Sequence, residues 1–354
     1  MRTARIISAQ GTVTVQDMGR TGWLAQGLSR GGAVDPLAVF EGAALLGQDS
    51  SLAVIELMSG SLRLRVDQPT RIALTGAPMR AQLGGSAETR SLAWHCSHLI
   101  PSRAELSISP GPDGGFGYLH FGGGLAVEQV MGARSVHLAA GIGGVLKPTD
   151  ILPLGEDPGS SVDLVIDPLP RFDGGTLRAV ESLQTPLFPP EQVARLQDTV
   201  FSRDNHGNRM GARLDPGGAE PFSASDGLNI VSEIVQPGDI QITGDGTPFV
   251  LLAECQTTGG YPRIATILPC DLPIVAQAPQ GAALRIRMID REAGLAAMRA
   301  YLRDIDGLTS RIGQRRRDPA QMGDLLSYNL IGGVVDAAQP DHFHAHIHHP
   351  REKS

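Results

Sequence analysis

The sequence predicts a mainly β protein assembled from two similar halves. Most of the chain consists of short apolar runs of four to seven residues, each bounded by Gly, Pro or Asp. The 44 Gly and 25 Pro residues indicate many turns between these runs. Regularly spaced short strands favour β-barrels or sandwiches over a parallel sheet with crossover helices.

Six runs rich in Val, Ile and Leu are the strand candidates along the chain. They are ARIISA at 4–9, SLRLRV at 61–66, RIALTG at 71–76, SVDLVI at 161–166, FVLLAE at 249–254 and ALRIRMI at 283–289. β-branched and aliphatic residues between turn formers are typical of strands that are buried on at least one face.

Three helices are predicted among the strands. Asp35 and Pro36 form an N-cap and first-turn pair that opens the first helix, which Gly47 closes. The second follows Phe188 in FPPEQVARLQDTVF and has prolines at its start. The third begins at Arg291, where REAGLAAMRAYLRDI combines helical periodicity with good helix formers.

The two halves are inferred from a weak internal repeat. VIELMSGSLRLRV followed by RIALTGAP aligns with IVSEIVQPGDIQIT followed by PFVLLAEC, at an offset of about 177 residues. Chance similarity between two β-rich halves is the alternative. We expect a first domain over 1–170, a second domain over 171–340 that includes a C-terminal helical segment, and a His-rich tail over 341–354. The boundary is expected in the Pro/Gly-rich stretch at 168–190.

Composition and charge exclude several classes of protein. Hydrophobic residues make up 41% and charged residues 19%, which is typical of a globular chain. The net charge is −7 and the longest basic run is Arg315–Arg317, which argues against a general nucleic-acid binder. With 28 Arg and two Lys, the chain has no G-x-x-x-x-G-K-[ST] loop, so a nucleotide would be held by backbone amides, Arg or a metal.

The expected location is the cytoplasm. The first residues contain no apolar run long enough for a secretion signal. The three cysteines, Cys96, Cys255 and Cys270, lie far apart and form no C-x-x-C pair, which suits free thiols in a reducing compartment. A nucleophilic role for Cys255 is disfavoured, because its neighbour Glu254 would raise the pKa of the thiol.

Three Gly-rich polar segments are the candidate functional sites. The first, residues 16–35, places Asp17, Arg20, Arg30 and Asp35 among glycines that let the backbone approach a ligand. The second, residues 202–218, alternates arginines with glycines. For these two segments the alternatives are a wide loop held by a structural ion pair and a solvated basic loop.

The third segment, residues 253–277, gathers polar side chains directly after an apolar strand. They are Glu254, Gln256, Thr257, Thr258 and Tyr261, beside a Gly-Gly pair. Such a density of polar groups is costly unless they meet a ligand, a partner or one another. A binding site is therefore the favoured interpretation here.

These segments also carry a resemblance to a known family. Q-D-x-G-R-x-G at 16–22, G-G-A-x-D at 31–35, N-R-x-G-x-R-L at 208–214, Q-T-T-G-G-Y-P-x-I-A at 256–265 and N-L-I-x-G-V-V-D-A at 329–337 follow one another in order. In this order they resemble the allophanate hydrolase subunit 2 family, which includes the C subunit of 5-oxoprolinase and the carboxyltransferase half of urea amidolyase. The resemblance implies two tandem cyclophilin-like β-barrel domains with a few helices.

The resemblance also implies roles for individual residues. Catalytic roles fall on Asp17, Arg20, Arg209 and Tyr261, and substrate-binding roles on Asp35, Asn208, Gln256, Thr257, Thr258 and Gln277. Glu254 is added to the expected substrate-binding residues because of its place in the third polar segment. No metal ligand is implied. Two departures stand out: Glu254-Cys255 replaces the usual Asp-Arg, and Leu45-Leu46-Gly47-Gln48 replaces L-V-G-N. Loss of that Arg removes a bidentate anion contact, so the substrate or activity can differ from the type enzyme.

Three functions follow from the resemblance as hypotheses. The first is a subunit of a heteromeric ATP-dependent amidohydrolase, a 5-oxoprolinase, in which ATP with Mg²⁺ is held by this chain or largely by a partner. The partners would be a B-like subunit (allophanate hydrolase subunit 1-like) and a possible third oxoprolinase subunit. The second is the carboxyltransferase half of a biotin-dependent urea carboxylase system, with biotin arriving on another protein. The third is a non-catalytic regulatory subunit.

The C-terminal sequence DHFHAHIHHP at 341–350 lies beyond the family motifs. In an extended strand His342, His344, His346 and His348 would share one face and could hold Zn²⁺ or Ni²⁺. A disordered tail is the favoured interpretation, because few polar neighbours are available to support such ligands.

Overall fold

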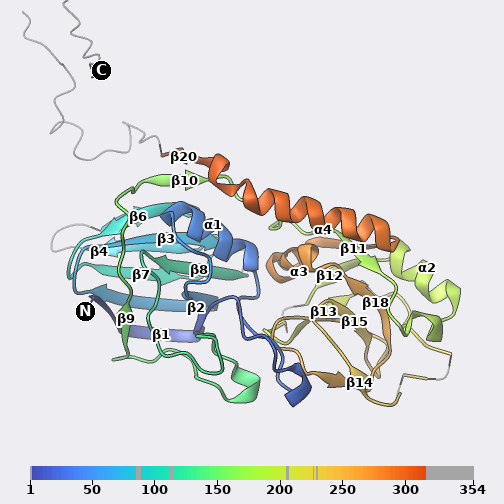
Figure 1. Ribbon diagram of the computed structural model, residues 1–354. Coiled ribbons are helices and arrows are strands. Elements are labelled where there is room, and N and C mark those ends of the chain that lie inside the picture. Colours follow the sequence, from blue (N-terminus) through green and yellow to red (C-terminus); the bar gives the residue numbers. More distant parts are fainter. Residues whose placement is uncertain are drawn as a thin grey trace, which may run out of the picture. The chain divides into compact units, whose positions relative to one another are not determined.

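The computed structural model describes residues 2–84, 89–111, 115–204, 207–225, 227–228 and 230–315. These residues belong to a compact unit that ends at Gln314, apart from Arg315, which follows it. Strands dominate this unit, and four α-helices lie among the described residues (Figure 1). The prediction of a mainly β fold with two barrel-like halves is therefore confirmed. The fifth family motif and the His-rich tail lie outside the described residues.

The first half is a curled sheet of 11 strands. Its strands are β1 (Arg2–Gln16), β2 (Val54–Val66), β3 (Thr70–Gly76), β4 (Arg80–Gly84), β5 (Thr89–Leu92), β6 (Cys96–Ile100), β7 (Glu105–Ser109), β8 (Phe116–Phe121), β9 (Ile151–Leu154), β10 (Leu164–Ile166) and β20 (Ile312–Gln314). The long strands β1 and β2 pair antiparallel, and β8 pairs with both β2 and β3. Every residue of β8 is buried, so this strand lies at the centre of the first half.

Helix α1 (Pro36–Leu46) packs on strands β3 and β8 of this sheet. The Asp35 carboxylate accepts from Ala38 N at 3.3 Å, Pro36 occupies the first turn, and Gly47 ends the helix with φ 62°. The predicted N-cap, first residue and C-cap are thus confirmed.

The second half is a closed barrel of seven strands in the order β11-β18-β15-β16-β13-β12-β19. These are β11 (Gly175–Val180), β12 (Val200–Arg203), β13 (Gly211–Asp215), β15 (Asp239–Ile242), β16 (Pro248–Leu251), β18 (Arg263–Ile267) and β19 (Ala283–Met288). Aliphatic residues and the stacked Phe201–Phe222 pair, with centroids 6.2 Å apart, fill its core. Strands β14 (Glu233–Ile234) and β17 (Thr258–Gly259) form a separate two-stranded sheet.

Three helices belong to the barrel half. They are α2 (Pro190–Asp198), α3 (Leu272–Gln277) and α4 (Arg291–Asp306). Figure 1 shows α4 running along the outside of β11, with which it is in contact. The predicted helices after Phe188 and from Arg291 are confirmed, whereas the six-residue α3 was not predicted. No helix among the described residues is long and apolar enough to cross a membrane.

Two predicted strands are shorter than the sequence suggested. The run at 161–166 forms β10 only from Leu164, because Asp163 has a positive φ of 55° that interrupts the extended backbone. The run at 249–254 ends as β16 at Leu251. Beyond it, Leu252 N donates to Met210 O and Glu254 N donates to Arg209 O, so the chain leaves the ladder toward the second Gly-rich segment.

The two repeat copies fall on the two halves. The acidic residue of the first copy, Glu56, lies in β2, and that of the second, Glu233, lies in β14. One strand departs from the expected division into residues 1–170 and 171–340. Strand β20, at the end of the described chain, pairs with β10 of the first sheet. The domain boundary near residue 170 stays a prediction.

A pH-dependent stability is expected from a buried histidine between α1 and the first sheet. His120 is 1% exposed, bonds to Thr75 Oγ1 at 2.8 Å and packs on Gly42, where a Cβ would lie 2.2 Å from its ring. Burial lowers the pKa of His120 to about 3. Between pH 6.5 and that value the unfolded chain binds a proton that the folded chain does not, so stability falls as the pH is lowered.

The expected loss from His120 alone is about 2 kcal/mol between pH 6.5 and 5, at about 1.4 kcal/mol per pH unit. The measurement is the free energy of unfolding by urea at both pH values, for the wild-type chain and for His120→Gln. The variant should lose about 2 kcal/mol less over this interval. Equal losses in the two chains would contradict a neutral His120 in the folded state.

Candidate functional site

A buried arginine joins the two halves of the molecule. Arg209 lies just before β13 of the barrel, is 3% exposed, and has every guanidinium nitrogen engaged. Nε donates to Glu254 Oε1 at 2.7 Å, Nη1 donates to Glu56 of the first sheet, and Nη2 donates to Gly32 O at 2.7 Å. Burial lowers the pKa of Arg209, but the Glu56 and Glu254 carboxylates outweigh it and hold the pKa above its ordinary value.

Glu254 connects this arginine to a histidine of the first half. Its Oε2 accepts from Leu138 N at 3.0 Å and Ala139 N at 3.4 Å, and lies 4.0 Å from His137 Nδ1. The opposite ring nitrogen of His137 lies 2.8 Å from Ser29 Oγ. Burial lowers the pKa of His137 against the opposing effect of Glu254, so the ring is neutral over most of the physiological range. We call Glu56, Tyr118, His137, Arg209 and Glu254 the junction cluster.

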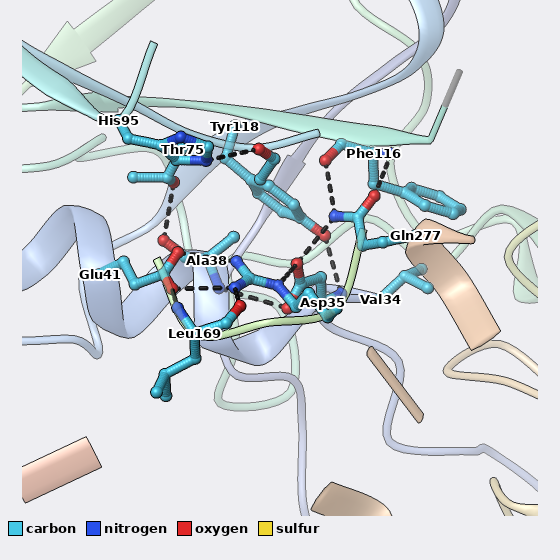
Figure 2. A network of polar contacts seen from close by, with 12 residues as sticks. Val34, Asp35, Ala38, Glu41, Thr75, His95, Phe116, Tyr118, Leu169 and Gln277 are labelled. Atoms are coloured by element: carbon cyan, nitrogen blue, oxygen red, sulfur yellow. Dashed lines mark hydrogen bonds and ion pairs between the residues drawn. The ribbon is translucent and has the colours of Figure 1, made fainter. Parts of the chain in front are cut away.

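Tyr118 extends the junction cluster toward helix α1. Its hydroxyl donates to Glu56 Oε2 at 2.7 Å and accepts from Asp35 N at 2.8 Å. Figure 2 shows Tyr118 and Gln277 both directed toward Asp35. Burial, and next the charge of Glu56, raise the pKa of Tyr118 well above its ordinary value, so the phenol stays protonated and donates.

The Asp35 side chain lies in a second buried group. Asp35 Oδ2 accepts from Arg171 Nε at 2.7 Å and from Gln277 Nε2 at 2.7 Å, and Arg171 also donates to both oxygens of Glu41. Gln277 comes from α3 of the barrel half and pairs with both backbone groups of Phe116 at 2.9 Å in the first sheet (Figure 2). The sequence-predicted Asp35 and Gln277 are thus brought together, and they link the two halves.

Asp17 and Arg20 lie together in the first Gly-rich segment. The Asp17 carboxylate accepts from Gly19 N at 2.8 Å, from Arg134 N at 2.6 Å and from the Ser135 hydroxyl. Arg20 is 1% exposed and donates through Nη2 to Ser135 O. Burial lowers the pKa of Arg20, opposed by the nearby charges of Asp17 and Glu254.

The remaining predicted residues lie nearer to the surface. Asn208, Gln256 and Thr258 are exposed, Thr257 is half-buried, and Tyr261 is 39% exposed. Asn208 Oδ1 accepts from Met210 N at 2.7 Å, and Gln256 donates to Gln241 Oε1 at 3.2 Å. Among the described residues Tyr261 forms no hydrogen bond or ion pair with the junction cluster. The catalytic and substrate-binding roles of all these positions stay predictions.

A pocket of about 310 Å³ opens beside the junction cluster. Its wall consists of Thr12, Met58, Leu138, Ala139, Asn208, Arg209, Met210 and Glu254. This volume lies at the lower end of the range for small-molecule sites, and it combines apolar walls with a few polar groups, as such sites do. The pocket is therefore the candidate site for a small polar substrate.

Several residues of the site were not predicted from the sequence. Glu56 had one signal, since it is the acidic residue of the first repeat copy and lies in the otherwise apolar start of its strand, residues 54–58. His137 and Ser135 lie in a loop without a recognisable motif, and Tyr118 lies in a buried strand. Cys255 is 2% exposed, and burial, with Asp239 adding to it, raises the pKa of its thiol to about 12. A thiol with this pKa is a poor nucleophile.

Comparison with known proteins decides the family. The family described as "Carboxyltransferase domain, subdomain A and B" matches residues 26–288. The chain belongs to this family. Residues 26–288 include the Asp35 group, the junction cluster and the pocket wall except Thr12. The resemblance inferred from the ordered motifs is confirmed.

Two relatives and one solved structure show how this carboxyltransferase-domain protein compares with others. The chain is 31% identical to the 5-oxoprolinase C subunit of Escherichia coli (strain K12) over 315 residues, covering 87% of this chain and 98% of the relative. It is 28% identical to the 5-oxoprolinase C subunit of Haemophilus influenzae over 288 residues, covering 80% and 90%. The Kluyveromyces lactis urea carboxylase is similar in fold, with a TM-score of 0.75 at 19% identity over 90% of this chain and 31% of that one.

Proposed function

We propose that the chain is a subunit of a heteromeric ATP-dependent amidohydrolase that converts 5-oxo-L-proline, ATP and water to L-glutamate, ADP and phosphate. The observation that carries the proposal is the small pocket at the junction of the halves, bordered by Arg209 and Glu254. The names of the two curated relatives, each the C subunit of a 5-oxoprolinase, support the choice of substrate.

The proposed reaction explains the need for ATP. An unstrained amide is unreactive, and transfer of the γ-phosphoryl group from ATP to the amide oxygen releases ADP and activates the carbonyl carbon. Water then adds to this carbon and the ring C–N bond breaks, which gives the free amine and leaves an acyl phosphate at the former amide carbon. A second water hydrolyses the acyl phosphate to the carboxylate and phosphate. In the proposal this chain holds the amide between its two halves.

The residues beside the pocket do not fit a triphosphate. Arg209, the guanidinium in the pocket wall, has all three nitrogens engaged by Glu56, Glu254 and Gly32. Glu254 also lines the pocket, and its negative charge opposes a polyphosphate. We therefore place ATP and its Mg²⁺ on a partner, either the B-like subunit or a third subunit, that meets this chain at the pocket.

A carboxyltransferase half of a biotin-dependent system is the second candidate. The family description and the fold shared with the urea carboxylase favour it. In that case biotin would arrive on another protein, and urea or a similar amide would occupy the pocket. A regulatory subunit without turnover would use the same surface only for binding.

The deciding experiment is co-expression with the presumed partner subunits, followed by measurement of ADP release with 5-oxoproline, with urea and without substrate. ADP release that depends on 5-oxoproline supports the proposal. No response to 5-oxoproline overturns it. Capture of a biotinylated protein would then favour the carboxyltransferase. If the complex neither responds to 5-oxoproline nor captures a biotinylated protein, the regulatory subunit is favoured.

Obstruction of the pocket is expected to remove activity without unfolding the chain. Met210 is 37% exposed in the pocket wall, so Met210→Trp should fill the entrance and lower kcat/KM on the order of tenfold or more. The matched control is Leu183→Trp, at a 93% exposed position outside the pocket. Full activity of Met210→Trp, at an unchanged unfolding midpoint, would exclude this pocket as the substrate site.

A further inference from the structure

Arg20 differs from the other buried arginines in its hydrogen bonds. It is 1% exposed, yet its Nε and Nη1 atoms have no hydrogen-bond partner among the described residues. Only Nη2 is engaged within this part of the chain, by the backbone oxygen of Ser135. By contrast, Arg171 and Arg209, which are equally buried, have every guanidinium nitrogen engaged. Two nitrogens of a buried cation thus have no acceptor in the described part of the chain.

Leaving a buried charged donor unpaired is expensive, which points to a missing acceptor. The guanidinium keeps a free donor on each of its two edges, Nε on one and Nη1 on the other. Either edge, together with Nη2, presents the fork geometry that matches a carboxylate. A planar anion on either edge therefore satisfies one of the two unpaired donors of Arg20.

Gly31 lies next to both Arg20 and His137. Gly31 has φ 62°, and a Cβ at this position would lie 3.8 Å from Arg20 Nη1 and 3.2 Å from His137 Cδ2. A side chain at residue 31 would therefore fill the region next to the free nitrogen. His137 connects the same region to Glu254 and hence to the pocket wall.

The surrounding charges restrict which anion fits. Asp17 and Glu254 both act on Arg20 through space, but each carboxylate is held by its own donors and neither forms an ion pair with Arg20 among the described residues. The single negative charge of a carboxylate is offset by the positive charge of Arg20. The second charge of a phosphate would have no such offset and would be opposed by both Asp17 and Glu254.

We infer that Arg20 binds the carboxylate of the substrate, so that the substrate class is a small amide that carries a carboxylate rather than a neutral amide or a phosphorylated compound. The inference rests on the proposed function and assigns Arg20 to substrate recognition. It also distinguishes Arg20 from Arg209, which has no nitrogen free for an anion.

The test compares two ligands that differ only in the carboxylate, 5-oxoproline and 2-pyrrolidinone. Binding of each to the full chain with its partner subunits is measured by calorimetry, for wild type and Arg20→Lys. Wild type should bind 5-oxoproline roughly 10- to 100-fold more tightly, the range for hydrogen bonds to a charged group. In Arg20→Lys the ratio of the two affinities should fall close to one. The variant should also raise KM for 5-oxoproline more than it lowers kcat.

Arg30→Lys is the matched control, because Arg30 lies in the same segment but is exposed and donates to Met18 O at 2.8 Å. It should keep the wild-type ratio. Gly31→Ala, which fills the space next to Nη1, is the second variant and should reduce the ratio even where Arg20→Lys does not fold. Inorganic phosphate should not compete with 5-oxoproline.

Three results would overturn the inference: equal affinity of wild type for the two ligands, an unchanged ratio in Arg20→Lys or in Gly31→Ala, or competition by phosphate as strong as by 5-oxoproline itself. The proposed function fails separately. Absence of ADP release with 5-oxoproline removes the hydrolase proposal, whereas carboxylate-selective binding that depends on Arg20 would still identify the anion site. Normal ADP release with an unchanged KM in Arg20→Lys removes only the inference.

Discussion

Arg171→Met is expected to lower the free energy of unfolding by about 3–5 kcal/mol, the usual effect of removing one partner from a buried ion pair. The Arg171 side chain and both of its carboxylate partners, Asp35 and Glu41, are 0% exposed. Nε donates to Asp35 at 2.7 Å, and Nη2 donates to Glu41 at 2.7 Å. Without the guanidinium, two carboxylates remain buried next to each other. Burial already raises the pKa of Glu41 against the effect of Arg171.

Urea unfolding of wild type and variants measures this effect. Arg213→Met is the control, since Arg213 forms an ion pair with Asp245 in which both side chains are largely exposed, at 46% and 58%. We expect the control to lose about 1 kcal/mol or less, as surface ion pairs do. Glu41→Gln in the Arg171→Met background should restore part of the loss by removing one buried charge. Similar losses for Arg171→Met and Arg213→Met would contradict the importance of burial.

The elements predicted correctly are those whose cause is local. The helix from Pro36 has its N-cap, its first-turn proline and its C-cap glycine within 13 contiguous residues, and all three act as expected. The run at 71–76 is confirmed as β3 because an apolar strand between turn formers needs no distant information. By contrast, pairing of β20 with β10 joins residues about 150 positions apart, and no local pattern indicates it.

The site could be predicted only in part for the same reason. The Gly-rich segments that contain Arg209, Glu254 and Asp35 were identified as polar segments that interrupt apolar strands, and the structure brings them to the junction. Glu56 and Tyr118 have ordinary positions in strands, and their importance arises from the opposite half of the molecule. The sequence also could not show which arginine has nitrogens free for a ligand. Arg20 and Arg209 both lie in Gly-rich segments, but Arg20 has two unpaired nitrogens among the described residues, whereas all three nitrogens of Arg209 are engaged.

Arg209→Met is expected to cost about 3–5 kcal/mol of unfolding free energy as well, but with an additional loss of activity. This arginine is the shared partner of Glu56 in the first sheet and Glu254 after β16, so its removal leaves a buried carboxylate on each side of the junction. Since Glu254 and residue 209 both border the pocket, its shape and charge change together. Arg209→Lys keeps one charge but cannot replace three differently directed hydrogen bonds, so it should recover only part of the loss.

A double-mutant cycle with Glu56→Gln and Arg209→Met measures how much the contact between these two side chains contributes to the unfolding free energy, apart from their contacts with other residues. If the pair joins the halves as the geometry indicates, the two losses should be strongly non-additive, because the first change already breaks the contact. Arg213→Met provides the control, since Arg213 belongs to the neighbouring strand β13 and pairs with Asp204 and Asp245 at 46% side-chain exposure. Additive losses at positions 56 and 209 would mean that each residue stabilises its own half alone. The pocket between them would then not depend on a fixed junction.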